Sequence, residues 1–361
     1  MTIPAPHYRP TTSRRPGSVS RPLSAGSTHQ VDDGVQEREP AAVPLLTAIQ
    51  PGDPAAPRPV DRRAILVAVR GATCLNPSLE WAARRARSAD LPLTLVHAVP
   101  AADSVPPGTC YADVVAAGRR MLQDEATRWS TRYPTLRVGT YLHCGDVVHA
   151  LLGLSADASL LVLGADRMNT LTGVFEGSVA IQVVLGSLAP VLIIPAGHRD
   201  SGDRNGTAHS HVVVGVDGSE ESYAALARAA AEAHRSGAAL RVVAAVKPGS
   251  PSSDALAASA PGMLRSVHAA YPSLGVSWIV DVLRTPARAL MRHSRDAELL
   301  VIGRHGRGAR AGMGVGSVTH TLLLRPPCLT LVITSPGRAA PGGTDAGIAQ
   351  GATHRSPSVS G

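Results

Sequence analysis

A glycine-rich stretch near the end of the chain has the residue types of a loop that binds an oxygen anion. Four apolar residues, Leu299 to Ile302, predict a short buried strand, and Ser317 opens a stretch of helical character. Between them lie six glycines, Gly303, Gly306, Gly308, Gly312, Gly314 and Gly316. Glycine allows backbone N–H groups to turn inward, and a helix N-terminus adds unpaired donors. Three arginines would attract the anion further: Arg304, Arg307 and Arg310.

The glycine spacing separates this stretch from two common nucleotide motifs. No Gly-Lys-Ser/Thr closes it, which excludes a P-loop, and the dinucleotide fingerprint requires a different spacing. Here two residues separate Gly303 from Gly306, and nine more precede Gly316-Ser317. An ordinary flexible loop in an α/β domain is the alternative interpretation, because such motifs also occur by chance.

The elements that would position this loop occur twice along the chain. Apolar runs predict strands at 64–70 and 212–217, at 93–99 and 240–246, at 137–143 and 276–282, at 160–163 and 299–302, and at 191–194 and 329–333. Helices are expected between them at 76–88 and 219–236, about 111–133 and 261–271, and 146–156 and 285–295. A short helix follows each glycine-motif loop. Alternation of strand and helix predicts a parallel sheet with helices on both faces.

The repeat and the glycine spacing together resemble the universal stress protein family, over about residues 62–197 and 210–336. The resemblance implies two tandem doubly wound domains, Rossmann-like and similar to the adenine nucleotide α-hydrolases. Each would have a five-stranded parallel sheet of order 3-2-1-4-5. A nucleotide would bind at the carboxyl ends of the strands, which is also where the switch-point rule for open α/β sheets places a ligand. Residues 198–209 would be a linker, and 1–61 and 337–361, rich in small and polar residues, disordered tails.

The resemblance transfers an ATP site to the second repeat. Asp217 stands where the family has an aspartate that contacts the adenine and ribose, although a turn aspartate beside Gly218 is an alternative interpretation. The second strand ends where the family's backbone contacts adenine. The full set of expected binding residues is Gly215, Val216, Asp217, Ala245, Val246, Gly303, Arg304, His305, Gly306, Arg307, Gly308, Gly316, Ser317, Val318 and Thr319.

The first repeat departs from the same pattern. Arg70 takes the aspartate position, Arg167 replaces the second glycine, and Asp166 would repel phosphate. Gly177-Ser178 remains. We therefore expect this repeat to be degenerate for ATP, with binding of another anion by the two arginines as the alternative.

Composition limits the remaining possibilities. Hydrophobic residues make up 44% of the chain and aromatic residues 3%, which indicates cores of Val, Leu, Ile and Ala. The net charge of +8 is dispersed, so no specific nucleic-acid binding is expected. No apolar stretch has the length of a membrane helix. Four cysteines without a C-x-x-C pair predict reduced, mostly buried thiols in a cytoplasmic protein, and the group His143, Cys144 and His149 does not have standard metal-ligand spacing.

The sequence therefore predicts an ATP-binding regulator or sensor of stress, with or without Mg²⁺, rather than a dedicated enzyme. His305 is a candidate base, but no pair of carboxylates accompanies it in the loop. A slow ATPase and a nucleotide-independent scaffold are the alternatives. The two repeats are expected to pack through their last strands as an intramolecular pseudo-dimer, and two chains to form a homodimer.

Overall fold

The computed structural model describes residues 63–71, 76–165, 177–196, 198, 211–246, 249–307 and 315–334. All of them belong to one compact unit, Pro57–Gly361. The predictions for the tails at 1–61 and 337–361, and for nearly all of the linker, lie outside the described residues.

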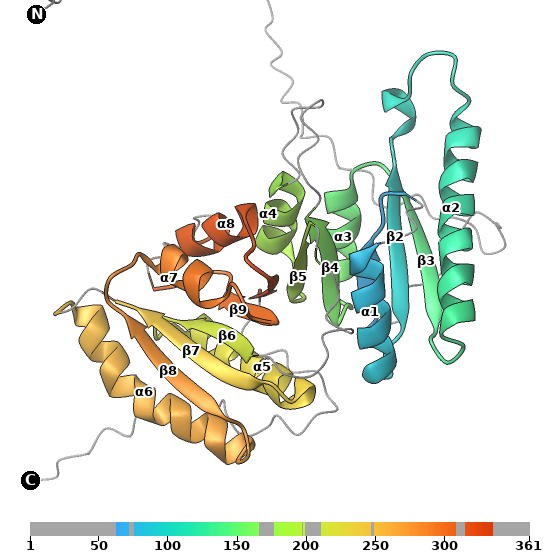
Figure 1. Cartoon of the computed structure of the whole chain (residues 1–361). Helices are drawn as coiled ribbons and strands as arrows, with labels where there is room; N and C mark the ends of the chain where they lie inside the picture. The colour runs from blue at the N-terminus through green and yellow to red at the C-terminus, as the bar shows by residue number, and fades with distance from the viewer. Residues whose placement is uncertain are drawn as a thin grey trace, which may run out of the picture. The chain divides into compact units, whose positions relative to one another are not determined.

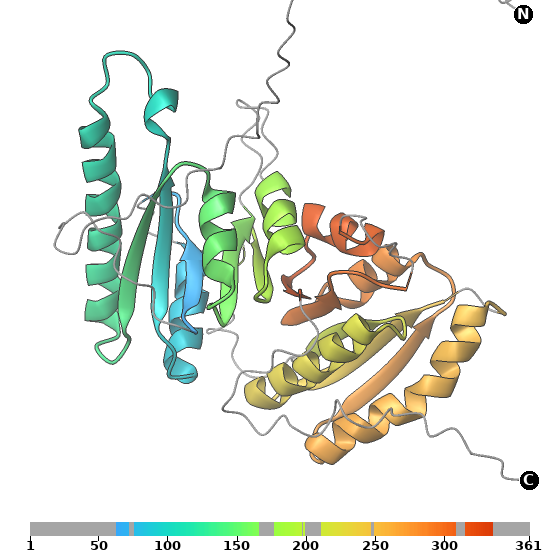
Figure 2. The ribbon, with the colours of Figure 1, turned by 180° about the vertical axis from the view of Figure 1, so that it is seen from behind.

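The first repeat alternates strands and helices as predicted (Figure 1). Its elements are β1 (Ile65–Ala68), α1 (Pro77–Ser88), β2 (Leu93–Val99), a short 3₁₀ helix (Ala102–Ser104), α2 (Tyr111–Arg132), β3 (Val138–Cys144), α3 (Val147–Ser155), β4 (Leu160–Ala165), α4 (Gly177–Gly186) and β5 (Val191–Pro195). Helix α2 lies along β2 and β3, as Figures 1 and 2 both show.

The second repeat follows the same order. Its elements are β6 (His211–Val216), α5 (Glu220–Ser236), β7 (Ala239–Ala245), α6 (Pro251–Ala270), β8 (Val276–Asp281), α7 (Pro286–His293), β9 (Leu299–Gly303), α8 (Ser317–Leu324) and β10 (Leu329–Ile333). Two predicted helix starts are confirmed by their caps. Asn76 accepts from the N–H groups of Ser78 and Leu79 at the start of α1, and Ser219 accepts from Ser222 N at the start of α5.

One predicted helix start was wrong. Helix α6 begins at Pro251 rather than near Pro261, which lies inside the helix. Ser250 caps the true start by accepting from Ser253 N at 3.3 Å, and proline is well suited to the first helical position, where no backbone N–H is needed. Because proline is unfavourable inside a helix, the sequence alone does not indicate that one helix continues through Pro261.

The strand order 3-2-1-4-5 is confirmed in both repeats. The described strands form one ten-stranded sheet, ordered β3-β2-β1-β4-β5-β10-β9-β6-β7-β8. Neighbours within each repeat are parallel, whereas β5 and β10 pair antiparallel with Leu192 opposite Leu331. In the second repeat β6 lies between β7 and β9, so strand order reverses at β6 and opens a crevice at its carboxyl end.

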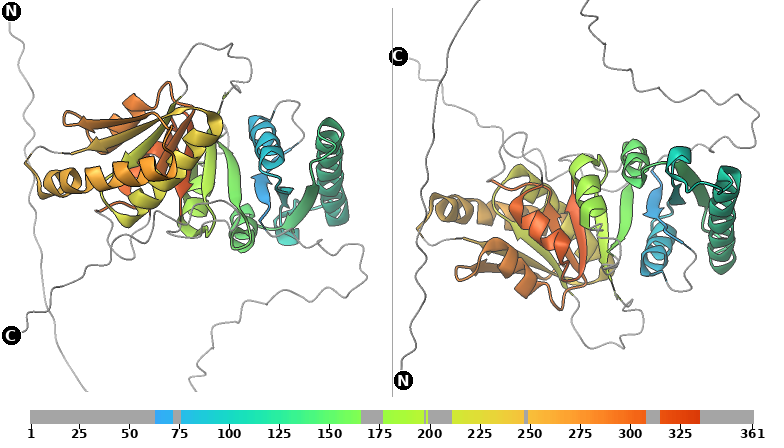
Figure 3. Two further views of the ribbon diagram at one scale, coloured as in Figure 1. Left: turned by 90° about the horizontal axis from the view of Figure 1, so that it is seen from below. Right: turned by 90° about the horizontal axis from the view of Figure 1, so that it is seen from above.

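Helices cover both faces of the sheet (Figure 3), and apolar side chains form one layer on each face. One layer contains side chains of α1, α2, α5 and α6, and the other contains side chains of α3, α4, α7 and α8. The strands supply Val, Leu and Ile to both layers, as the composition predicts.

The expectation of mostly buried cysteines was wrong for two of the described ones. Cys328 is buried, but Cys110 and Cys144 are exposed, because one precedes α2 and the other ends the edge strand β3. In the part of the chain that the structure describes, no helix combines the length and apolar character needed to cross a bilayer.

Candidate nucleotide site

A cavity of about 330 Å³ lies at the carboxyl ends of β6, β7 and β9, where the strand order reverses. Most of the predicted binding residues line it: Gly215, Val216, Asp217, Ala245, Gly303, His305, Gly306, Gly316, Ser317, Val318 and Thr319. Residues that the sequence did not single out complete the lining: Ser222, Val243, Pro286, Leu290, Ile302 and Val315.

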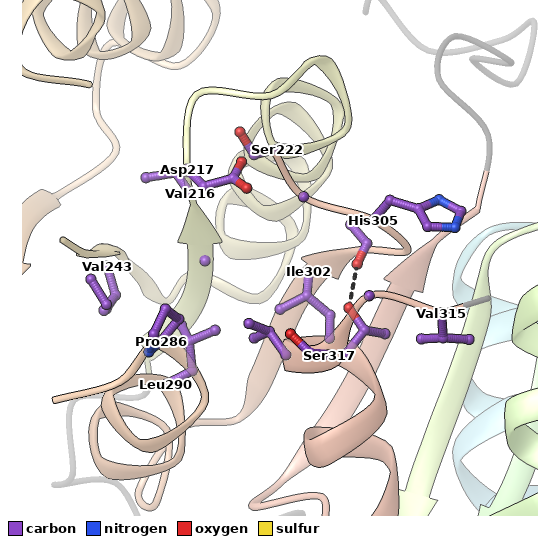
Figure 4. Close-up of a pocket in the computed structure, with 17 residues that line it drawn as sticks. Val216, Asp217, Ser222, Val243, Pro286, Leu290, Ile302, His305, Val315 and Ser317 are labelled. Carbon is purple, nitrogen blue, oxygen red and sulfur yellow. Dashed lines mark hydrogen bonds between the residues drawn. The ribbon is translucent and has the colours of Figure 1, made fainter. Parts of the chain in front are cut away.

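The cavity has an apolar wall and a polar end (Figure 4). Val243, Pro286 and Leu290 gather on one side, while Asp217 and Ser222 lie at the end of β6. The apolar residues were missed because they carry no motif; they come from β7 and from the first turns of α7. Gly215 leaves room for this wall, since a Cβ atom there would lie 2.9 Å from Leu290 Cδ1.

Asp217 forms the turn that its sequence context allowed, and it also lines the cavity. Its Oδ1 atom accepts from the N–H of Ser219 at 3.0 Å and from the Ser219 hydroxyl at 2.7 Å, which fixes the turn into α5. Its Oδ2 atom accepts from Arg307 N at 2.7 Å, so the carboxylate also joins the glycine loop. The turn aspartate is therefore also a wall of the cavity.

Gly306 has a structural requirement of its own. A Cβ atom at this position would lie 2.4 Å from Asp217 Oδ2, which is closer than any side chain tolerates. From its place in the glycine motif, this residue is expected to permit the close approach of a phosphate. In the structure the neighbour that requires it is a carboxylate of the chain itself.

His305 has a carboxylate partner that the loop sequence does not contain. Glu221, in the first turn of α5, accepts from the backbone N–H of His305 through Oε2, and its Oε1 lies 3.1 Å from His305 Nδ1. The pair is partly buried, and in Figure 4 the His305 ring points away from the other labelled residues. Glu221 lies 84 residues before His305, and no spacing rule connects them.

The predicted arginines do not line the cavity. Arg304 turns towards the first repeat, where its Nη1 atom donates to the carbonyl oxygens of Leu185 at 2.9 Å and Ser187 at 3.4 Å. Arg307 is exposed, and its guanidinium lies over Gly218. Val246 is also absent from the lining, and Gly308 lies outside the described residues.

Helix α8 presents its N-terminus to the cavity. Gly316 precedes it and has no side chain with which to cap the first N–H groups, so they remain donors for an anion. Thr319 is 4% exposed and donates from Oγ1 to the Gly303 carbonyl at 2.8 Å, which is the hydrogen bond drawn in Figure 4. Its side chain therefore holds α8 against the end of β9.

A buried carboxylate fixes the turn into α7, which supplies the apolar wall. Burial by itself would raise the pKa of Asp281, but hydrogen bonds from Arg284, from the N–H groups of Leu283 and Arg284, and from His293 hold that pKa below its ordinary value. Asp281 is thus a charged anchor at the end of β8.

Comparison with known proteins identifies the two repeats. The sequence pattern of the Universal stress protein family matches residues 61–195 and again residues 209–334. The chain belongs to the universal stress protein family. Universal stress protein Rv2005c of Mycobacterium tuberculosis is 30% identical over 293 residues, covering 74% of this chain and 95% of the relative. Universal stress protein Rv2623 of the same organism is 31% identical over 288 residues, covering 73% and 95%.

A solved structure shares the fold of this universal stress protein. The crystal structure of a universal stress protein from Archaeoglobus fulgidus DSM 4304 has a TM-score of 0.57 at 16% identity, covering 76% of this chain and 97% of that one. At this identity the likeness concerns the fold alone.

The first universal stress protein domain has a different cavity. It is a shallow, open pocket of about 470 Å³ beside the ends of β1 and β2 and along α2, and its lining includes Arg70, His97 and Met121. Helix α2 covers the opposite face of the sheet from α3 and α4, the counterparts of α7 and α8 at the second-domain cavity. Asp166 and Arg167 lie outside the described residues, whereas Gly177 begins α4.

The described residues offer no group of three His, Cys, Asp or Glu side chains that could hold a metal ion. In the group of His143, Cys144 and His149, burial and the neighbouring His149 lower the pKa of His143, and Asp146 opposes this effect.

Proposed function

We propose that this universal stress protein is an ATP-binding regulator or sensor in a stress response, and that it binds ATP in its second domain. The observation that carries this proposal is the cavity at the strand reversal, where three strand ends and the N-terminus of α8 converge. Ligand pockets of proteins commonly measure roughly 300 to 1,000 Å³, so about 330 Å³ is enough to enclose the adenosine part of a nucleotide.

The residues present fit the chemistry of an adenine nucleotide. The apolar wall of Val243, Pro286 and Leu290 suits a flat aromatic base. Asp217 Oδ2 is an acceptor to which a ribose hydroxyl could donate. The N–H groups at the start of α8 suit phosphate oxygens. Mg²⁺, if used, would arrive with the triphosphate.

A regulatory role agrees better with this site than a dedicated catalytic one. The candidate base, His305, has its Nδ1 atom against Glu221, and its ring points away from the labelled lining residues (Figure 4). A general base must reach the proton that it removes. Slow ATP hydrolysis is the second candidate, and a nucleotide-independent scaffold is the third.

The proposal includes an assembly. Antiparallel pairing of β5 with β10 supports an intramolecular pseudo-dimer of the two domains, because each last strand covers the exposed edge of the other. We further propose a homodimer of two such chains in the cytoplasm.

The test is to identify any nucleotide released when the purified protein is denatured and to measure its Tm with added ATP. We expect an adenine nucleotide, or a Tm that rises with ATP concentration because the ligand binds the folded state. If no nucleotide is released and Tm does not respond to millimolar ATP, the scaffold is the better function.

A further inference from the structure

Two glutamates begin α5, and they have different surroundings. Glu220 is exposed to solvent. Glu221 points at the glycine loop, and only 19% of its side chain is exposed. The loop is closely fitted to Glu221, since a Cβ atom at Gly303 would lie 3.0 Å from Glu221 Cβ and 3.3 Å from its Oε2.

Carboxylates of this turn occupy two backbone donors of the loop. Glu221 Oε2 accepts from the N–H of His305, and Asp217 Oδ2 accepts from the N–H of Arg307 at 2.7 Å. Both N–H groups belong to the loop that lines the cavity with Gly303, His305 and Gly306, and backbone N–H groups of a glycine loop are donors for phosphate. A phosphate oxygen that approached the N–H of His305 would have to displace Glu221 and would meet its negative charge.

In the part of the glycine loop that the structure describes, few positive charges offset the carboxylate. Arg304 donates to carbonyl oxygens of the first domain, and the Arg307 guanidinium lies over Gly218, next to Asp217. His305 contacts Glu221 directly, with its Nδ1 atom 3.1 Å from Glu221 Oε1. The carboxylate of Glu221 therefore repels an anion that lies beside residues 303–306.

We propose that Glu221 is a specificity-determining residue of the nucleotide site, an internal carboxylate that competes with ligand phosphates for the glycine loop. It lowers affinity for ligands with several phosphates and leaves recognition of the adenosine part unchanged. This inference rests on the proposed nucleotide site. Glu221 sets how strongly the site distinguishes ATP from AMP and adenosine.

The experiment compares Glu221→Gln with Glu220→Gln in the full chain, using calorimetry with adenosine, AMP and ATP. Both variants remove one negative charge from the first turn of α5, but only the first removes the carboxylate that contacts the loop. For Glu221→Gln we expect ATP affinity to rise about three- to tenfold and adenosine affinity to change less than about twofold. For Glu220→Gln we expect less than about twofold for every ligand, because exposed charges are screened.

A second variant, Glu221→Ser, also removes the carboxylate and should likewise raise ATP affinity. The Tm of every variant shows whether it is folded. Weaker ATP binding in Glu221→Gln would overturn the inference, since the carboxylate would then organise the loop for the ligand. An equal gain in Glu220→Gln, or an equal gain for adenosine, would overturn it as well. If the wild type binds ATP without this pattern, only the inference fails; if the wild type and all variants bind none of the three ligands, the proposed function fails too.

Discussion

At Gly306 the backbone passes so close to Asp217 that no side chain fits between them. The carboxylate approaches because it accepts from the N–H of the next residue, Arg307, at 2.7 Å. A single glycine therefore allows the end of β6 and the glycine loop to close one end of the cavity together.

Replacement of Gly306 by Ala should lower stability and weaken ATP binding. The new Cβ atom must displace the Asp217 carboxylate, so we expect a loss of about 1–3 kcal/mol in the free energy of unfolding and at least about tenfold in ATP affinity. Denaturant unfolding and calorimetry measure the two effects. Gly153→Ala in α3 is the control, because nothing lies within 4 Å of its Cβ position, and it should stabilise by about 0.5–1 kcal/mol. An ATP affinity unchanged in Gly306→Ala would contradict the close approach.

The sequence could predict that Gly306 and Asp217 lie at the cavity, because Gly306 belongs to the spaced glycine motif and Asp217 follows the first strand of its repeat, but it could not pair the loop with Glu221. That contact joins residues 84 apart, and an acidic residue in the first turn of a helix is ordinary. The direction of Arg304 was likewise beyond prediction, since its partners are backbone carbonyls of the first domain.

Among the elements, α8 has the closest connection to the site. It is eight residues long and begins at the cavity, so its position depends on hydrogen bonds to the rest of the domain rather than on its own helical stability. Thr319 donates to the end of β9, and Gly316 N donates to the Arg304 carbonyl at 3.2 Å. These two bonds place its N-terminal donors beside the glycine loop.

Thr319→Val should detach α8 from β9 with little change in shape. The Gly303 carbonyl would lose its partner, and we expect a loss of about 1–2 kcal/mol in stability together with weaker ATP binding. Thr321→Val is the matched control, because Thr321 is exposed and bonds only within its own helix, to Ser317 O. Equal effects of the two substitutions on unfolding and on ATP binding would show that the bond to β9 does not position α8.

The strands and most helices could be predicted from their pattern of apolar residues, but the start of helix α6 could not. Buried strands such as β4 and β9 are continuous apolar runs, and their alternation with helices was sufficient to predict a parallel sheet, whereas the strand order came from the family resemblance. Helix α6 contains two prolines, at 251 and 261, and the sequence did not show which one begins it.

For the whole molecule, the two domains are joined by more than the β5–β10 pair. Glu232 of α5 accepts from Arg85 of α1 at 2.7 Å and also contacts Arg228 and Arg235. Burial lowers the pKa of Arg85, and the charge of Glu232 opposes that effect. Thr334 adds a buried bond across the pair, from Oγ1 to the Ala189 carbonyl.

Glu232→Gln should destabilise the chain by about 2–4 kcal/mol, because it leaves the partly buried Arg85 without a counter-charge. Glu220→Gln, on the exposed side of the same helix, should change stability by no more than about 0.5 kcal/mol. Chemical denaturation of both variants measures this difference. Equal stabilities would mean that the contact between α1 and α5 contributes nothing to joining the domains.

The central claim, that one domain of the two binds ATP, is tested most directly by calorimetry of ATP binding to the full chain. The account predicts one equivalent of ATP per chain, because the second domain keeps Asp217, Gly306 and Gly316 while the first has Arg70 and Arg167 at two of these positions. Binding should be lost in Gly306→Trp and retained in Gly177→Trp. Two equivalents per chain, or binding that survives Gly306→Trp and disappears in Gly177→Trp, would contradict the account.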